Sequence, residues 1–171
     1  MATQKPFVSP SFSYETLEET LDIKPREAEL FIGIPRETSF QENRIGLTPE
    51  AVCVLGNNGH RVVGESKAGL GASYRDIDYS DAGAKVVHTK KEVFECDILV
   101  KSAPVSEEEL PLLKHNQFII SPIHLSVMKQ EILEKMMEQR ITALSFENLK
   151  DDSGHNPIVR SMSEIAGSAV M

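Results

Sequence analysis

From Glu29 onward, short apolar runs alternate with segments that carry helix signals. The runs are rich in Ile, Val and Leu, which is typical of strands that are covered on both faces of a parallel sheet. Strand–helix alternation at this spacing predicts βαβ units joined by right-handed crossovers. We therefore expect an α/β fold, Rossmann-like or flavodoxin-like, with helices on both faces of a parallel sheet. The expected strands are 29–34, 61–65, 84–87, 97–101, 117–121 and 141–146.

The segments between the strands contain helix starts. The order Thr48-Pro49-Glu50 is that of an N-cap followed by a first turn. Glutamate follows Thr89, Ser106 and Ser161 at the spacing of a capping box. Apolar residues recur every four positions from Met128 to Met136, which indicates a helix with one apolar face. We expect helices at 49–57, 75–82, 106–114 and 128–137, and further helices that begin near 90 and at 161.

The composition of the chain changes before Glu29. Residues 1–28 carry prolines, serines and a Glu-rich stretch, and only 15–23 has the apolar spacing of a short helix. We expect an N-terminal extension here, either packed on a partner subunit or solvated. The main domain should occupy 29–160, and 161–171 should begin a helix that leads to another domain.

Charge and composition exclude several classes of protein. The 171-residue chain has 18 basic and 26 acidic residues, a net charge of −8 and a pI of about 5.2. A nucleic-acid-binding surface needs a basic excess, so we expect no nucleic-acid partner. No apolar run approaches the roughly 20 residues that span a bilayer, and the N-terminus lacks a signal-type apolar core. Two distant cysteines, Cys53 and Cys96, suit a reducing compartment, so we expect a cytoplasmic protein without membrane contact.

Ligands of open parallel sheets bind beyond the carboxyl ends of the strands, and three polar residues lie there. Arg44 follows the first strand and could hold a carboxylate in a bidentate pair; the alternative is a surface ion pair with Glu42 or Glu37. Lys101 ends a strand and could polarise a carbonyl oxygen, or it simply marks where water begins. His124 could carry a proton near neutral pH or serve as a structural histidine. Together the three suit a 2-oxo or 2-amino acid.

Other site signatures are weak or missing in the sequence. Gly69 and Gly71 have the G-x-G spacing of a dinucleotide loop, but Tyr74 stands where the third glycine belongs. We therefore interpret this loop as a flexible turn between a strand and a helix. The His, Cys, Asp and Glu residues show no metal-ligand spacing, so we expect no metal.

A set of motifs follows in a fixed order between Leu30 and Gly167. The motifs are IGIPRETSFQENRIGLTPEAV (32–52), ESKAGLGASYRDIDYSDAGAKV (65–86), DILVKSAP (97–104), SPIHLS (121–126), ITALSFEN (141–148) and MSEIAG (162–167). In combination they resemble the N-terminal part of alanine dehydrogenases and of the α subunit of proton-translocating transhydrogenases. The resemblance implies a substrate-binding domain, here 29–160, beside a separate Rossmann domain that binds NAD.

The resemblance also implies roles for individual residues. Arg44 matches the family's substrate arginine, Lys101 its carbonyl-binding lysine and His124 its catalytic histidine. Met162 matches a residue that borders the substrate, and Ser163 one that lies near the cofactor. The Gly-rich NAD fingerprint should follow Met171, so we expect this chain to lack the NAD-binding domain and to be inactive alone.

His124 distinguishes the two relatives, because the transhydrogenase has no His-Leu pair at this position. The resemblance therefore favours the N-terminal half of an NAD-dependent L-alanine dehydrogenase, which converts L-alanine, NAD and water to pyruvate, ammonium and NADH. We expect the whole protein to be a homo-oligomer. Two alternatives remain, a transhydrogenase α subunit and a non-catalytic module that binds small carboxylates or other subunits.

Overall fold

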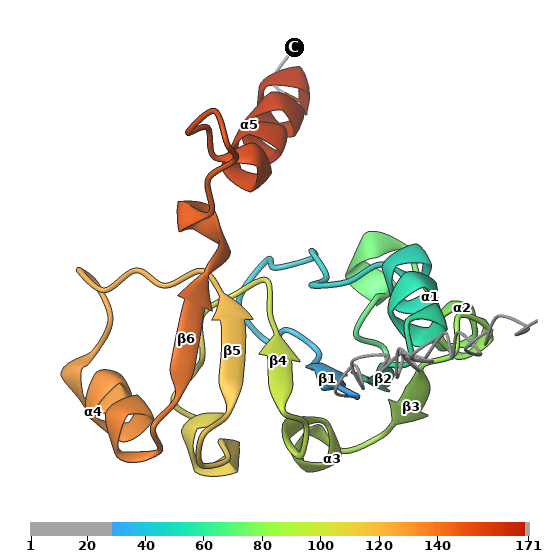
Figure 1. Cartoon of the computed structure of the whole chain (residues 1–171), viewed down its shortest axis with the longest axis horizontal. Coiled ribbons are helices and arrows are strands. Elements are labelled where there is room, and N and C mark those ends of the chain that lie inside the picture. Colours follow the sequence, from blue (N-terminus) through green and yellow to red (C-terminus); the bar gives the residue numbers. More distant parts are fainter. Residues whose placement is uncertain (1–28, 170–171) are drawn as a thin grey trace, which may run out of the picture.

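The structure, a computed structural model, describes residues 29–169. The N-terminal extension predicted for 1–28 lies outside the described residues. All six strands lie parallel in one sheet, in the order β3-β2-β1-β4-β5-β6 (Figure 1). The predicted α/β fold with a parallel sheet is therefore confirmed. The strands are β1 (Phe31–Ile34), β2 (Arg61–Glu65), β3 (Lys85–Val87), β4 (Ile98–Val100), β5 (Phe118–Ser121) and β6 (Thr142–Ser145).

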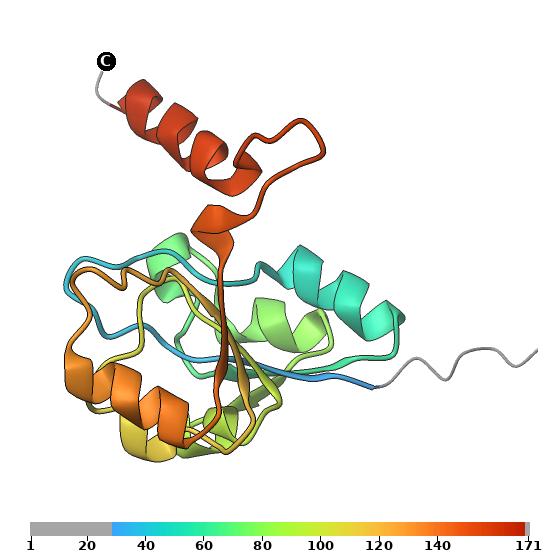
Figure 2. The ribbon, with the colours of Figure 1, turned by 60° about the vertical axis from the view of Figure 1, so that its left-hand side comes forward.

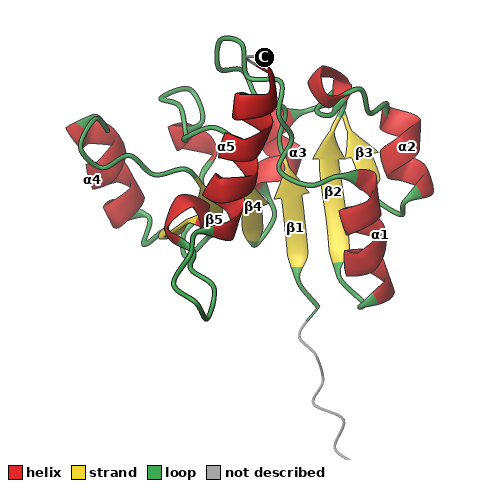
Figure 3. Cartoon of the chain, turned by 90° about the horizontal axis from the view of Figure 1, so that it is seen from above, coloured by secondary structure: helices red, strands yellow, loops and turns green. Residues whose placement is uncertain are grey.

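Helices cover both faces of the sheet, as predicted. On one face, side chains of α1 and α2 pack with Ile32 and Ile34 of β1. On the other, side chains of α3 and α4 pack with Leu99 and Ile119. The last helix, α5, stands beyond the carboxyl ends of the strands (Figures 1 and 2) and lies over the central part of the sheet when the molecule is viewed from above (Figure 3). The helices are α1 (Pro49–Asn57), α2 (Asp76–Asp81), α3 (Lys90–Phe94), α4 (Gln130–Glu138) and α5 (Pro157–Ala169).

The strands β2 and β3 are added on one side of β1, and β4 to β6 are added on its other side. β1 and β4 are thus neighbours, although β2 and β3 lie between them in the sequence. This is a topological switch point, where the loops after two adjacent strands diverge and leave a crevice. The loops after β1 and β4 therefore begin side by side at the carboxyl ends of these central strands. These loops carry Arg44 and Lys101.

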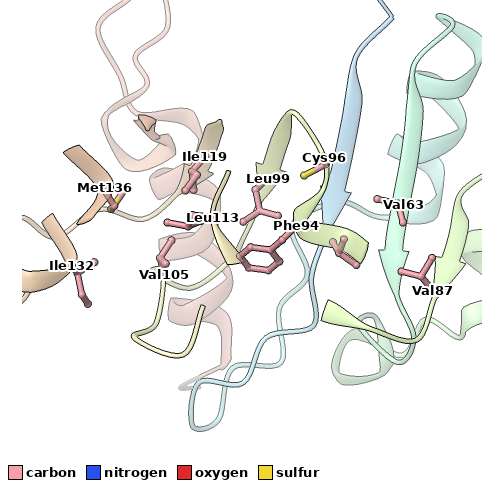
Figure 4. Close-up of a cluster of buried hydrophobic side chains, with 11 residues drawn as sticks. Val63, Val87, Phe94, Cys96, Leu99, Val105, Leu113, Ile119, Ile132 and Met136 are labelled. Atoms are coloured by element: carbon pink, nitrogen blue, oxygen red, sulfur yellow. The ribbon is translucent and has the colours of Figure 1, made fainter. Parts of the chain in front are cut away.

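A cluster of apolar side chains between the sheet, α3 and α4 forms the larger part of the core (Figure 4). Phe94, Leu99 and Ile119 are its most deeply buried members among the large residues. The close approach of α3 to β1 requires glycine at position 33, since a Cβ there would lie 2.6 Å from Cys96 Sγ and 2.7 Å from the Val93 carbonyl oxygen. Burial raises the pKa of the Cys96 thiol to about 12, so it packs as a small apolar side chain.

Two of the predicted helices differ in the structure. The segment 106–114 contains only the short 3₁₀ turn η2 (Leu110–Leu112). The Ser106 amide does donate to Glu109 Oε2 at 3.0 Å, but Pro111 has no N–H and disfavours helical backbone before it. The helix α5 begins at Pro157 rather than at Ser161, whose hydroxyl donates to the Pro157 carbonyl one turn earlier. The helix can begin at Pro157 because the first helical position needs no N–H. The boundaries at 28/29 and 160/161 stay predictions.

Substitution of Gly33 tests the packing of α3 on β1. Gly33→Ala should lower the free energy of unfolding by about 1–3 kcal/mol, because the new methyl group overpacks the interface with Cys96 and Val93. Urea unfolding followed by circular dichroism measures the change. Gly64→Ala in the adjacent strand is the matched control, since a Cβ there meets nothing within 4 Å. Equal stability of the two variants would contradict this packing.

Candidate active site

Arg44 and His124 line the same cavity at the carboxyl edge of the sheet. The cavity has a volume of about 220 Å³ and is bounded by the loops after β1, β4, β5 and β6. This cavity therefore brings together Arg44 and His124, and an adjoining cavity is lined by Arg44 and Lys101. The remaining residues that line the first cavity are Ser39, Phe40, Gln41, Glu42, Ser102, Ala103, Pro104, Pro122, Phe146 and Glu147.

Arg44 is oriented by a two-point pair with Glu42. Arg44 Nε lies 2.8 Å from Glu42 Oε1, and Nη2 lies 2.5 Å from Oε2. The hydrogen bonds from Arg44 lower the pKa of Glu42, and the same contacts raise the pKa of Arg44, so the pair is ionised at neutral pH. The ion pair that the sequence offered as an alternative is therefore present.

The pair with Glu42 leaves one edge of the guanidinium for a ligand. Glu42 occupies the Nε/Nη2 side, whereas Nη1 lies 4.0 Å from the sulfur of Met162 and Nη2 lies 3.4 Å from the Ser102 carbonyl oxygen. About half of the Arg44 side chain is exposed. A carboxylate on this Nη1/Nη2 edge would replace the long contacts with Ser102 and Met162 while Glu42 stays in place, and two parallel hydrogen bonds would hold it there.

Two glycines fix the backbone on either side of Arg44. A Cβ at Gly71 would lie 2.8 Å from Asn43 Cα, and one at Gly46 would lie 2.9 Å from the Val100 carbonyl oxygen. The 43–46 segment is thus held between the Gly-rich loop and β4. The loop that we interpreted only as a flexible turn has a positioning function, because glycine at 71 is what permits the close approach.

His124 lies opposite the carboxylate of Glu147. Its Nδ1 is 3.6 Å from Oε2 of Glu147, which belongs to the 3₁₀ turn η3 (Phe146–Asn148) after β6. The His124 carbonyl oxygen accepts from the amides of Val127 and Met128, both at 3.0 Å, so a turn fixes its backbone. About half of the imidazole is exposed, so it can exchange a proton with a ligand in the cavity.

Lys101 is deeply buried, and two carboxylates hold its ammonium. Its Nζ lies 2.8 Å from Glu37 Oε2 and 3.0 Å from Glu109 Oε1, and the side chain is 1% exposed. Burial by itself would raise the pKa of Glu109, but the Lys101 charge, the Ser106 amide and Lys90 together lower it. The predicted contact of Lys101 with a substrate carbonyl stays a prediction. The ammonium has three N–H groups, and these two carboxylates occupy two of them.

The two predicted residues of α5 differ in their surroundings. Met162 lines an apolar cavity of about 450 Å³ between α5 and the carboxyl ends of β4 and β5, and Arg44 and Lys101 line the same cavity. This position is consistent with the predicted border of the substrate site. Ser163 is exposed, and its hydroxyl donates to the Val159 carbonyl at 2.9 Å. Its contact with a cofactor stays a prediction.

The residues that organise these side chains carry little signal in the sequence. Glu42 and Glu37 entered only as alternative ion-pair partners of Arg44, and Glu109 only as part of a capping box. Their partners lie on other segments, so sequence spacing gives no direct signal for Glu37 and Glu109. Within 29–169, no three His, Cys, Asp or Glu side chains gather as metal ligands, and no helix is long and apolar enough to cross a membrane.

Substitution of Gly71 tests how Arg44 is positioned. Gly71→Ala should displace the backbone at Asn43 and move the Nε–Hε resonance of Arg44 in a ¹H–¹⁵N spectrum of the chain. Gly56→Ala on α1 is the control, because a Cβ there meets nothing within 4 Å and alanine favours helix. An Arg44 resonance that stays in place in Gly71→Ala would show that the Gly-rich loop does not position it.

Comparison with known proteins agrees with these observations. A family model described as alanine dehydrogenase/PNT, N-terminal domain, matches residues 33–166. Alanine dehydrogenase 2 of Staphylococcus aureus (strain N315) is 32% identical over 136 residues, which make up 80% of this chain and 36% of that protein. Alanine dehydrogenase of Staphylococcus epidermidis (strain ATCC 12228) is 33% identical, with the same shares of the two chains covered.

Two solved structures extend the comparison. An L-alanine dehydrogenase superposes with a TM-score of 0.76 at 35% identity, over 81% of this chain and 38% of the other. A transhydrogenase from Sinorhizobium meliloti superposes with a TM-score of 0.62 at 26% identity, over 68% of this chain and 35% of the other. The chain thus spans a little over a third of the length of these relatives. It belongs to the family defined by the N-terminal domain of alanine dehydrogenases and PNT proteins.

Proposed function

We propose that this domain is the substrate-binding half of an NAD-dependent L-alanine dehydrogenase, an oxidoreductase that interconverts L-alanine with pyruvate and ammonium. The observation that carries the proposal is the pairing of a carboxylate-binding group and a proton carrier, Arg44 and His124, in one cavity. The alanine dehydrogenase relatives support the reaction class. A 2-oxo acid carries both groups that this pair would recognise, a carboxylate and an adjacent carbonyl.

Each residue of the cavity has a separate task in this proposal. Arg44 receives the substrate carboxylate on its Nη1/Nη2 edge, while Glu42 holds the other edge and so sets the direction of approach. His124 gives a proton to the carbonyl oxygen as ammonia adds to the carbon, and in the reverse direction it takes that proton from the resulting hydroxyl, with Glu147 orienting the ring. Met162 closes the apolar side of the site against the small methyl group of the substrate.

The described residues do not fit a dinucleotide. The only G-x-G pair in the loop after β2 is filled, because a Cβ at Gly69 would meet Tyr79 at 2.6 Å and one at Gly71 would meet Asn43 at 2.8 Å. No backbone cradle remains there for a pyrophosphate. NAD, which the proposed reaction requires as hydride acceptor, is on this proposal held by a domain outside residues 29–169.

A transhydrogenase subunit is the second candidate, favoured by the similarity to the Sinorhizobium meliloti structure. Hydride exchange between two dinucleotides needs no carboxylate clamp and no proton carrier for an amino acid. The pairing of Arg44 with His124 therefore favours the dehydrogenase. The acidic composition and the two free cysteines, Cys53 and Cys96, support a cytoplasmic protein, and we propose a homo-oligomer on the family's precedent.

Pyruvate binding tests the carboxylate clamp. Titration of the chain with pyruvate should move the Arg44 Nε–Hε and His124 resonances together. Arg44→Ala should weaken binding about tenfold or more, because a charge-assisted bidentate pair is lost, and Arg44→Lys should bind with intermediate affinity. Arg160→Ala on α5 removes an equal charge outside the cavity and should bind like wild type. Equal affinity in Arg44→Ala and wild type would overturn the assignment.

Turnover separates the role of His124 from that of Arg44. The 171-residue chain alone should not oxidise NADH in the presence of pyruvate and ammonium, because the Gly-rich loop within residues 29–169 leaves no cradle for a dinucleotide. In the longer protein expected here, His124→Ala should lower kcat about 10²–10⁴-fold, the usual effect of losing a general acid–base group, with little change in pyruvate affinity. Normal turnover in His124→Ala would refute its proton-carrying role.

A further inference from the structure

One side chain, that of Asn156, joins the start of α5 to the turn η3. Asn156 Nδ2 donates to the Glu147 carbonyl oxygen at 2.8 Å, and the two residues are nine positions apart in the chain. The chain leaves η3, loops outward and returns to begin α5 beside that turn (Figure 2). The hydrogen bond therefore closes this loop at its base.

The loop between η3 and α5 is held in shape by hydrogen bonds of its own. Asp151 Oδ1 accepts from the amides of Ser153 at 2.9 Å and of His155 at 2.8 Å. The Asp151 amide donates to the His155 carbonyl oxygen at 2.8 Å. Gly154 has a φ of +81°, which glycine adopts without strain. The loop thus returns the chain to η3 in a defined direction.

Asn156 is also the residue at which α5 begins. Its carbonyl oxygen accepts from the Arg160 amide at 3.0 Å, so it occupies the N-cap position of the helix that starts at Pro157. An N-cap asparagine stabilises its own helix through the side-chain oxygen, which accepts from the first turn. The Nδ2 group has no part in that task, and here it binds a different segment. Helix capping and the contact with η3 are therefore separable functions of one side chain.

Glu147 is the residue through which this hydrogen bond reaches the proposed site. Its Oε2 lies 3.6 Å from His124 Nδ1, and it lines the cavity together with His124 and Arg44. The pKa of Arg44 is raised chiefly by the hydrogen bonds to Glu42, and the charge of Glu147 adds to this increase. A shift of the Glu147 backbone would therefore move a carboxylate that acts on both functional groups of the cavity.

The helix α5 has a second contact with the site. Met162, in its second turn, places its sulfur 4.0 Å from Arg44 Nη1. Most other side chains of α5 are exposed, so few contacts within residues 29–169 hold the helix on the domain. Without the hydrogen bond of Asn156, the start of α5 and the η3 turn would be free to move apart.

We propose that Asn156 is a positioning residue of the site. Its side-chain amide fixes the η3 turn on the start of α5 and so places the Glu147 carboxylate beside the His124 ring. This inference rests on the proposed function only for the reaction in which His124 acts. The hydrogen bond and its effect on the ring are measurable in the chain without substrate.

NMR of the 171-residue chain without substrate tests the positioning role. Asn156→Ser keeps a good N-cap residue but is too short to reach Glu147, so the thermal midpoint should change little while the Cε1–Hε1 signal of the His124 ring shifts. Asn148→Ser, on η3 and exposed, is the matched control and should leave the His124 signal in place. An unshifted His124 signal in folded Asn156→Ser would overturn the proposal.

Asn156→Asp provides a second variant. Aspartate caps a helix as well as asparagine does, but its ionised side chain has no N–H to donate to Glu147. It should therefore shift the His124 signal as Asn156→Ser does. A shift in neither variant would show that the ring is positioned without Asn156.

Turnover in the longer protein tests the consequence for the reaction. Asn156→Ser should lower kcat about tenfold through a misplaced His124, with the KM for pyruvate changed by less than about twofold because Arg44 keeps its pair with Glu42. Unchanged kcat, or a loss confined to KM, would contradict the positioning role. Absence of pyruvate turnover in wild type would contradict the proposed function, whereas the substrate-free spectra would still decide the role of Asn156.

Wild type decides the question if both Asn156 variants fail to fold. A scalar coupling across the hydrogen bond, between Asn156 Nδ2 and the Glu147 carbonyl carbon, requires no substitution. We expect this coupling to be present, together with slow exchange of the Nδ2 protons with water. Absence of the coupling together with rapid exchange would overturn the proposal.

Discussion

The burial of the Lys101 ammonium is the constraint on which the arrangement of the site depends. A charge at 1% exposure must have opposite charges around it, and no carboxylate adjacent to Lys101 in the sequence provides them. Glu37 and Glu109 therefore have to come from the β1 loop and from the turn before η2. The ion pairs of Lys101 with these two carboxylates hold the loops after β1 and β4 together. The same loops carry Arg44 and border the cavity that Arg44 shares with His124.

The sheet topology allows the loops after β1 and β4 to contact each other, and close packing at glycines fixes the position of the segment that carries Arg44. β1 and β4 are neighbours at the switch point, so their loops begin side by side. Gly46 permits contact with Val100, and Gly71 permits contact with Asn43, so the segment that carries Arg44 has little freedom. Glu42 then aligns the guanidinium. The two glycine contacts and the pair with Glu42 together orient the guanidinium of Arg44, so that its Nη1/Nη2 edge is the one not paired with Glu42.

The fold and the site differ in how far the sequence predicts them. All six strands were predictable, because each contains a short apolar run bounded by turn or helix signals. Arg44, Lys101 and His124 were predictable as residues at strand ends. The partner choices were not, since Lys101 meets Glu37 at a separation of 64 residues and Arg44 meets Met162 at a separation of 118. Capping-box spacing predicted a helix from Ser106, but Pro111 and the engagement of Glu109 by Lys101 leave only a turn.

A crystal structure of the chain with oxamate, an unreactive analogue of pyruvate, tests the central claim most directly. The account predicts that the oxamate carboxylate lies on the Nη1/Nη2 edge of Arg44, with Glu42 still on the other edge. An oxamate carboxylate that lies away from Arg44, or that binds only with Glu42 displaced, would contradict the account.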